Sequence, residues 1–217
     1  MNMKKTVVFG KGELAIKITA YLMQCKDFEI SCVVPSIPEP KWCASLSNWC
    51  IENKIALIPS GNLEELNGQN YDLGISVYYN KIFNLDQISI FGKLLNIHNS
   101  PLPSYRGSNP INWALKNNES FHGVTLHEID SGVDTGPILN QVKFKIDSKI
   151  DEVEDVYRRC LDFGYILFLH SIHRIDELKP EIQDHSLSST YFIKDSVRLG
   201  DRIDFRRDMP RKKYPLF

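Results

Sequence analysis

The feature that most constrains the fold is a repeated alternation of short apolar runs with segments whose apolar residues recur at helical spacing. The runs, rich in valine, isoleucine and leucine, lie at 6–10, 28–34, 55–59, 73–79 and 93–98. Short continuous apolar runs are typical of parallel strands that are covered on both faces. Their alternation with helical segments predicts an α/β fold, with an open, Rossmann-like and mostly parallel sheet that carries helices on both faces.

The second half of the chain predicts two more strands between two helices. Ser108 or Asn109 suits a helix N-cap, and Pro110 then falls in the first turn, a position that proline favours. The expected ranges are a helix at 108–119, strands at 123–129 and 140–146 around a loop at 130–137, and a long helix at 151–178. The unit of strand, loop and strand at 123–146 therefore follows directly on the helix at 108–119.

Size and composition favour one domain. The chain has 217 residues, of which 42% are hydrophobic, enough for a single well-packed core. We expect this domain at 1–180 and a short C-terminal extension at 181–217, which serves dimerisation or substrate contact. Four apolar residues of the extension would form a homodimer surface: Tyr191, Phe192, Ile193 and Phe205.

Charge and cysteine usage exclude several classes of function. Twenty-six basic and 27 acidic residues give a net charge of -1, which argues against nucleic acid as a partner. No stretch approaches the ~18 apolar residues of a membrane span, and the first residues carry no secretory signal. Five cysteines without a CxxC pair favour reduced thiols over a disulfide or zinc framework. We therefore expect a cytoplasmic protein with no membrane partner.

Polar side chains stand at the end of the run 93–98. Asn96 and His98 alternate along the expected strand, so their side chains point to the same side. Asp134 lies in a loop between Gly132 and Gly136, whose φ freedom lets backbone approach a ligand. An amide donor, a proton acceptor and a carboxylate suit acyl transfer. The alternative is that these residues only cap turns.

The stretch LLNIHNSPLPSYRGSNPINWALKNNESFHGVTLHEIDSGVDTGPIL resembles the folate-dependent formyltransferases over about 45 consecutive residues. This group includes glycinamide ribonucleotide formyltransferase, methionyl-tRNA formyltransferase and the sugar N-formyltransferases. The resemblance implies that 1–180 is a formyltransferase catalytic domain whose catalytic trio is Asn96, His98 and Asp134. It also implies N10-formyltetrahydrofolate as the formyl donor, and no metal.

The resemblance gives each member of the trio a chemical task when a substrate amine attacks the formyl carbon. Asn96 would donate to the oxygen that gains negative charge, and losing such a donor typically costs about 3 kcal/mol of barrier. His98 would donate to that oxygen or accept the proton of the amine, and both roles stay open. Asp134 would hold or polarise the imidazole.

Two further groups of residues follow from the resemblance. The candidates for folate binding are Tyr78, Tyr79, Ile82, Asp130, Gly132 and Val133. The candidates for the substrate side, where a pyrophosphate favours basic side chains and backbone donors, are Lys11, Glu13, Tyr105, Arg106 and Gly107. For Tyr78 and Tyr79, the alternative to folate binding is ordinary packing at a strand end. For Arg106, the alternative to substrate binding is a structural clamp on the loop. The other histidines, at 122, 127, 170, 173 and 185, are expected on the surface or on helix faces.

The features that distinguish the subfamilies of this group indicate which amine receives the formyl group. Only 83 residues follow Asp134, whereas methionyl-tRNA enzymes carry a sizeable C-terminal domain. The turn FGKGELAI lacks the glycine- and serine-rich phosphate loop of the glycinamide ribonucleotide enzymes, and Asn99 stands where proline or glycine often follows the histidine. The chain is most similar to sugar N-formyltransferases.

This similarity implies a UDP- or dTDP-linked amino-dideoxy sugar, with the 4-amine as first expectation, in surface-polysaccharide or glycan biosynthesis such as that of lipopolysaccharide O-antigen. Two alternatives remain open. One is a compact methionyl-tRNA formyltransferase, and the other is a non-catalytic folate-binding module.

Overall fold

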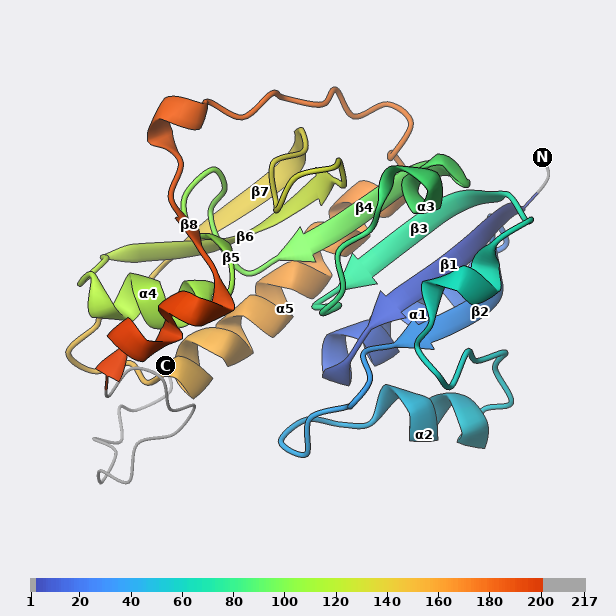
Figure 1. Ribbon diagram of the computed structural model, residues 1–217, viewed down its shortest axis with the longest axis horizontal. Coiled ribbons are helices and arrows are strands. Elements are labelled where there is room, and N and C mark those ends of the chain that lie inside the picture. The colour runs from blue at the N-terminus through green and yellow to red at the C-terminus, as the bar shows by residue number, and fades with distance from the viewer. Residues whose placement is uncertain (1–2, 201–217) are drawn as a thin grey trace.

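The computed structural model describes residues 3–200, and its centre is a six-stranded sheet (Figure 1). The strands are β1 (Lys4–Gly10), β2 (Phe28–Pro35), β3 (Tyr71–Val77), β4 (Phe91–His98), β6 (Phe121–Glu128) and β7 (Ile138–Lys145). They lie in the order β2-β1-β3-β4-β6-β7. The first four are parallel, and β6 and β7 pair antiparallel with their neighbours. The predicted open, mostly parallel α/β sheet is confirmed.

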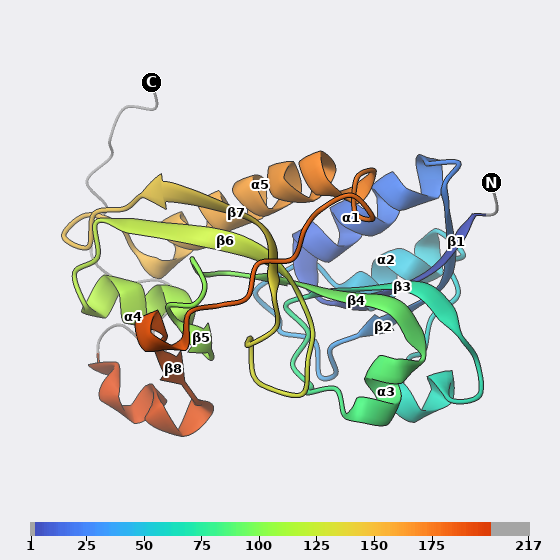
Figure 2. The same cartoon turned by 90° about the horizontal axis from the view of Figure 1, so that it is seen from above.

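The helices lie on both faces of this sheet. They are α1 (Gly12–Gln24), α2 (Leu46–Glu52), α3 (Leu85–Ser89), α4 (Pro110–Lys116) and α5 (Val153–Ile172), with 3-10 turns η1 (Leu63–Leu66), η2 (His185–Leu187) and η3 (Ile193–Arg198). Figure 2 shows α1 and α5 on one side of the sheet and α3 on the other. Both faces are therefore covered, as the continuous apolar runs predicted.

Two separate clusters of buried side chains form the core, one on each face. Within β1, Val8 packs into the cluster that includes α1 and α5, whereas Val7 and Phe9 pack into the opposite cluster with η1 and the α3 region. Successive strand residues point to opposite faces, so each apolar run supplies both clusters.

Some elements differ from the prediction. Residues 55–59 form no strand, because only Leu57 bridges to Val33 at the edge of the sheet. A small two-stranded sheet was not predicted: β5 (Arg106–Gly107) pairs in parallel with β8 (Thr190–Tyr191). This pairing joins the C-terminal segment to the loop that follows β4. Two-residue strands carry no periodic signal, which is why the sequence did not indicate them.

The expected homodimer surface is only partly available. Tyr191 is half-buried and stacks on Trp113, with ring centroids 4.1 Å apart. Phe192 and Ile193 are exposed, and Phe205 lies outside the described residues.

Two further features of the structure are the state of the cysteine thiols and the apolar character of the helices. All five cysteines are free, as expected from their spacing. In the part of the chain that the structure describes, no helix combines the length and apolar character that crossing a membrane requires.

The parallel strands β1, β3 and β4 end at the same edge of the sheet, and a tight approach between two of them shapes that edge. A Cβ at Gly10 would lie 2.0 Å from the Val77 carbonyl oxygen, and the φ angle of Gly10 is 144°. Only glycine fits there. The Lys11 amide then donates to the same carbonyl over 3.2 Å. This edge is where ligands bind in open α/β sheets.

Candidate active site

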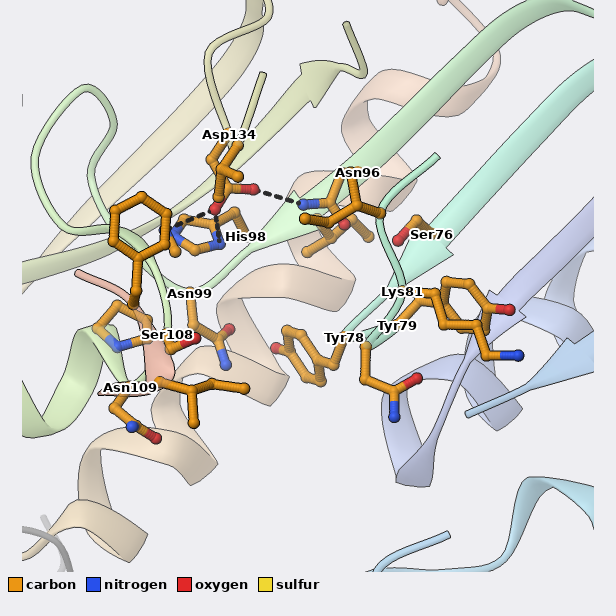
Figure 3. Close-up of a pocket in the computed structure, with 18 of the residues that line it drawn as sticks. Ser76, Tyr78, Tyr79, Lys81, Asn96, His98, Asn99, Ser108, Asn109 and Asp134 are labelled. Carbon is orange, nitrogen blue, oxygen red and sulfur yellow. Dashed lines mark hydrogen bonds and ion pairs between the residues drawn. The ribbon is translucent and has the colours of Figure 1, made fainter. Parts of the chain in front are cut away.

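A cavity of about 980 Å³ opens at the carboxyl ends of β1, β3 and β4 (Figure 3). Its wall combines the end of β4 with the 130–134 loop, the segment 78–83 that follows β3, and residues of α4 and α5. A cavity of this size matches the usual range for small-molecule sites. Three of the six non-glycine residues with positive φ in the described chain line it: Tyr78, Asn109 and Asp134. Such backbone conformations cluster at functional sites.

Asn96, His98 and Asp134 lie together in this cavity. Asn96 Nδ2 donates to Asp134 Oδ1 over 3.3 Å, and His98 Nδ1 lies 3.5 Å from Asp134 Oδ2. The Gly107 amide also donates to Oδ2, over 2.7 Å. The structure thus places the loop aspartate beside the strand histidine, which the sequence alone did not do.

Asp134 is a carboxylate that remains ionised although it is buried. Burial by itself would raise the pKa of Asp134. The electrostatic interaction with His98, with smaller contributions from His127 and from the hydrogen bond of the Gly107 amide, outweighs burial and holds that pKa well below its ordinary value. The group is therefore a fixed negative charge at neutral pH.

The hydrogen bonds of His98 decide which ring nitrogen is free. His98 Nε2 lies 2.9 Å from the carbonyl oxygen of Tyr105, which can only accept, so Nε2 carries a proton. In the neutral ring, Nδ1 then holds the lone pair, and it faces Asp134. A proton that arrives at Nδ1 is stabilised by the adjacent carboxylate.

His127 belongs to this cluster, which corrects the expectation that it lies on the surface. It is 1% exposed on β6, directly opposite Asn96 in the antiparallel register. Its Nδ1 donates to the Glu128 carbonyl over 2.7 Å, and Asn96 Nδ2 donates to its Nε2 over 3.1 Å. Both N–H groups of the Asn96 amide are therefore engaged, one with His127 and one with Asp134. Polar alternation along 123–129 was the available signal for His127.

His122 is also buried, at 0% exposure, and its Nε2 donates to the Asn99 carbonyl over 2.8 Å. The expectation of a surface position is therefore wrong for His122 too, because it faces inward on β6, which has a neighbouring strand on each side. His170, His173 and His185 are exposed, as expected.

A residue of the C-terminal segment holds the Asp134 loop. Gln183 is 3% exposed, and its Nε2 donates to the carbonyls of Asp134 and Gly136 over 2.9 and 2.7 Å. Its Oε1 accepts from the Arg106 guanidinium, from Nε over 3.0 Å and from Nη2 over 2.6 Å. Nothing in the sequence indicated this role for Gln183.

Three residues expected on the substrate side do not line the cavity. Arg106 is 4% exposed and held by Gln183, so it is the structural clamp that was its alternative. The Tyr105 ring is buried, with its hydroxyl on Glu119, and Glu13 points to solvent from α1.

Lys11 and Gly107 do line the cavity. Burial lowers the pKa of Lys11 from its ordinary value. Nearby, Trp42 and Tyr157 meet edge to face, with centroids 5.5 Å apart. Tyr157 falls within the predicted long helix at 151–178, and no pattern singled out Trp42 in its loop.

All six folate candidates line the cavity. They are Tyr78, Tyr79, Ile82, Asp130, Gly132 and Val133. The hydroxyl of Tyr79 donates to the Gly61 carbonyl over 3.0 Å, which fixes its ring, while Ile82 is 69% exposed. Asp130 Oδ1 accepts from the Gly132 amide over 3.0 Å and shapes the loop. This wall offers apolar surface and backbone polar groups.

The sequence profile of the formyl transferase family matches residues 26–172. The chain belongs to this family. The resemblance seen in the stretch from 94 to 139 is thereby confirmed.

Two curated relatives of this formyl transferase chain are much longer than the match. The bifunctional polymyxin resistance protein ArnA of Wigglesworthia glossinidia brevipalpis is 33% identical over 176 residues, which cover 75% of this chain and 26% of ArnA. A methionyl-tRNA formyltransferase of Lachnospira eligens is 32% identical over 149 residues, which cover 67% of this chain and 46% of that enzyme. The chain therefore spans less than half the length of both relatives.

Two solved formyltransferase structures match the whole arrangement. WlaRD, a sugar 3N-formyl transferase in the presence of dTDP and 5-N-formyl-THF, has a TM-score of 0.81 and 30% identity, covering 90% of this chain and 72% of WlaRD. The N-formyltransferase from Helicobacter canadensis was solved in complex with folinic acid and dTDP-3-aminofucose. It has a TM-score of 0.79 and 30% identity, and the match covers 89% of this chain and 72% of the Helicobacter enzyme.

Proposed function

We propose that this chain transfers a formyl group from N10-formyltetrahydrofolate to the amine of a nucleotide-linked amino sugar. The observation that carries the proposal is the cluster of Asn96, His98 and Asp134 in one cavity. The cluster combines an amide donor, an imidazole with a free nitrogen and a buried carboxylate. These are the groups that amine formylation needs.

Each group has a role that its contacts favour. The Asn96 N–H that reaches Asp134 over 3.3 Å makes the longer of its two hydrogen bonds, so it is the one released to the formyl oxygen. His98 Nδ1 accepts the proton of the attacking amine, because Nε2 is committed to the Tyr105 carbonyl. Asp134 then balances the charge of the imidazolium, and this proton passes to N10 of the folate as the bond between N10 and the formyl carbon breaks. Base action by His98 is therefore favoured over oxyanion donation.

The residues of the folate wall fit the proposed donor. Tyr79 and Ile82 offer apolar surface, and the 130–134 loop offers backbone donors and acceptors. A flat, polar-edged pterin suits such a wall. The proposal places the pterin between these two segments, so that the formyl carbon faces Asn96 and His98.

The opposite wall fits a nucleotide diphosphate. Lys11 caps α1, a 13-residue helix whose N-terminus opens into the cavity, and both features attract anions. Trp42 and Tyr157 supply aromatic faces on which a base stacks. WlaRD and the Helicobacter canadensis enzyme were solved with dTDP ligands. These two enzymes favour dTDP and a 3-amine over the 4-amine expected from the sequence, and both amines belong in the test.

Methionyl-tRNA formylation is the second candidate, because curated relatives at 32% identity carry that name. The net charge of -1 does not favour a tRNA substrate.

A homodimer through Phe192 and Ile193 is a further part of the proposal, and light scattering of the purified chain tests it.

A mass-spectrometric acceptor panel tests the proposal. Purified protein and N10-formyltetrahydrofolate are incubated with dTDP- and UDP-linked 3-amino and 4-amino sugars, with methionyl-tRNA and glycinamide ribonucleotide alongside. The mass gain of one formyl group on a nucleotide sugar is the expected result. Formylation of methionyl-tRNA alone would transfer the assignment to the second candidate, and binding of folate without any transfer would favour a binding module.

A further inference from the structure

Two buried polar atoms beside His98 have no hydrogen-bond partner among the described residues. They are Tyr78 Oη and Asn99 Oδ1. Both residues line the cavity, and Figure 3 shows the Tyr78 hydroxyl pointing toward the Asn99 side chain. A buried polar group without a partner costs about 1–3 kcal/mol. Two such groups at one place in a ligand cavity indicate that a ligand atom completes them.

The chain fixes these two residues independently of each other. The Asn99 backbone is held by His122, whose Nε2 donates to the Asn99 carbonyl over 2.8 Å, and Asn99 is only 9% exposed. Tyr78 follows β3 with a φ of 57°, a conformation that is rare for a bulky residue. Its ring packs near Tyr157, with centroids 6.0 Å apart. The side chains are thus held near one another, close enough for the Asn99 amide to oppose the rise that burial causes in the pKa of Tyr78, while Asn99 Oδ1 stays without a donor.

We propose that Tyr78 and Asn99 form a specificity subsite for a hydroxyl group of the acceptor sugar, on a ring carbon next to the reacting amine. This inference rests on the proposed function. A hydroxyl both donates and accepts, so it can donate to Asn99 Oδ1 and accept from the Tyr78 hydroxyl. Asn99 directly follows His98 in the chain, which places this hydroxyl beside the amine that His98 deprotonates. Tyr78 thereby moves from the folate side to the sugar side.

The subsite predicts discrimination against acceptors that lack the hydroxyl. A deoxy analogue would leave both buried groups unpaired, and sites built to bond a substrate hydroxyl reject such analogues strongly. The expected ratio of kcat/KM between the hydroxylated and deoxy acceptors is at least about tenfold. The ratio reports only on the subsite, because the two acceptors have the same amine and nucleotide and both reactions use the same folate donor.

The experiment measures this ratio in four proteins. Wild type, Tyr78→Phe and Asn99→Ala are compared with Tyr71→Phe, a matched control that loses a tyrosine hydroxyl at the opposite end of β3 from Tyr78, where it bonds Gln69. The acceptors are the best nucleotide amino sugar and its analogues deoxygenated on either side of the amine. Thermal melts confirm that each variant is folded, and Tyr78→Phe keeps the packing of the ring.

The predicted result is that wild type and Tyr71→Phe discriminate, while in Tyr78→Phe and Asn99→Ala the ratio falls toward unity. Retention of the full ratio in Tyr78→Phe and Asn99→Ala would overturn the subsite while leaving formyl transfer intact, as would its absence in wild type. If wild type formylates no nucleotide sugar, the proposed function itself fails, and the subsite fails with it.

Discussion

Protonation of His122 is expected to destabilise the protein in mild acid. His122 is completely buried on β6, and its ring lies 6.0 Å from that of Phe144, nearly edge to face. Burial, with smaller contributions from the charges of His98 and Arg159, lowers the pKa of His122 from 6.5 to about 4. An unfolded chain therefore takes up a proton at this residue at a pH where the folded chain does not.

The sign and the size of the effect follow from linkage. Because the folded state binds fewer protons than the unfolded state between pH 6.5 and about 4, stability rises with pH across that window. The contribution of neutral His122 is fully present above the window and is lost as pH falls through it. With these two pKa values, lowering the pH from about 7 to about 5 costs about 2 kcal/mol of unfolding free energy.

Urea denaturation of wild type and His122→Gln at several pH values measures this term. Glutamine can still donate to the Asn99 carbonyl but does not titrate, so groups elsewhere change both proteins equally. The difference between the two proteins in unfolding free energy is expected to change by about 2 kcal/mol from pH 7 to pH 5. A difference that stays constant across this range would refute the burial argument.

Three other substitutions test the site. Asp134→Asn is expected to lower kcat by about 10²–10⁴-fold, because the His98 imidazolium loses its counter-charge; unchanged kcat in steady-state assays would contradict this. Gln183→Leu should cost about 3 kcal/mol in urea unfolding, because Arg106 and the Asp134 loop lose a buried partner, and a cost near zero would show that the clamp is dispensable. Lys11→Ala should raise KM for the nucleotide sugar about tenfold while leaving KM for folate unchanged; equal changes in both would contradict its placement on the nucleotide side.

The sheet and the position of the site were predictable because their signals are local and periodic. Each apolar run that became a strand carried residues for both faces, as Val7 and Val8 do. The polar Asn96 and His98 at the end of such a run indicated the edge where ligands bind. Asp134 was a candidate from its loop between two glycines, but only the resemblance joined it to Asn96 and His98, since the sequence does not show which strand a loop approaches.

The missed residues depend on long-range contacts. His127 meets Asn96 through the register of an antiparallel pair, and Gln183 reaches the loop from 49 positions further along the chain. The alternation along 123–129 indicates which face of the strand His127 takes but not that it meets Asn96, and no pattern in the sequence indicates the contact of Gln183. Arg106 was assigned by charge to a substrate anion, whereas its guanidinium is buried against Gln183. Charge alone does not distinguish a ligand contact from a clamp.

The most direct test of the central claim is the rate of formyl transfer by wild type and by His98→Ala. Both proteins receive N10-formyltetrahydrofolate and the nucleotide amino sugar that wild type accepts, and folate binding is measured separately by titration. The account predicts that His98→Ala binds folate as wild type does but forms formylated product at least about 10²-fold more slowly. Equal rates of product formation would show that the cluster of Asn96, His98 and Asp134 does not carry the reaction.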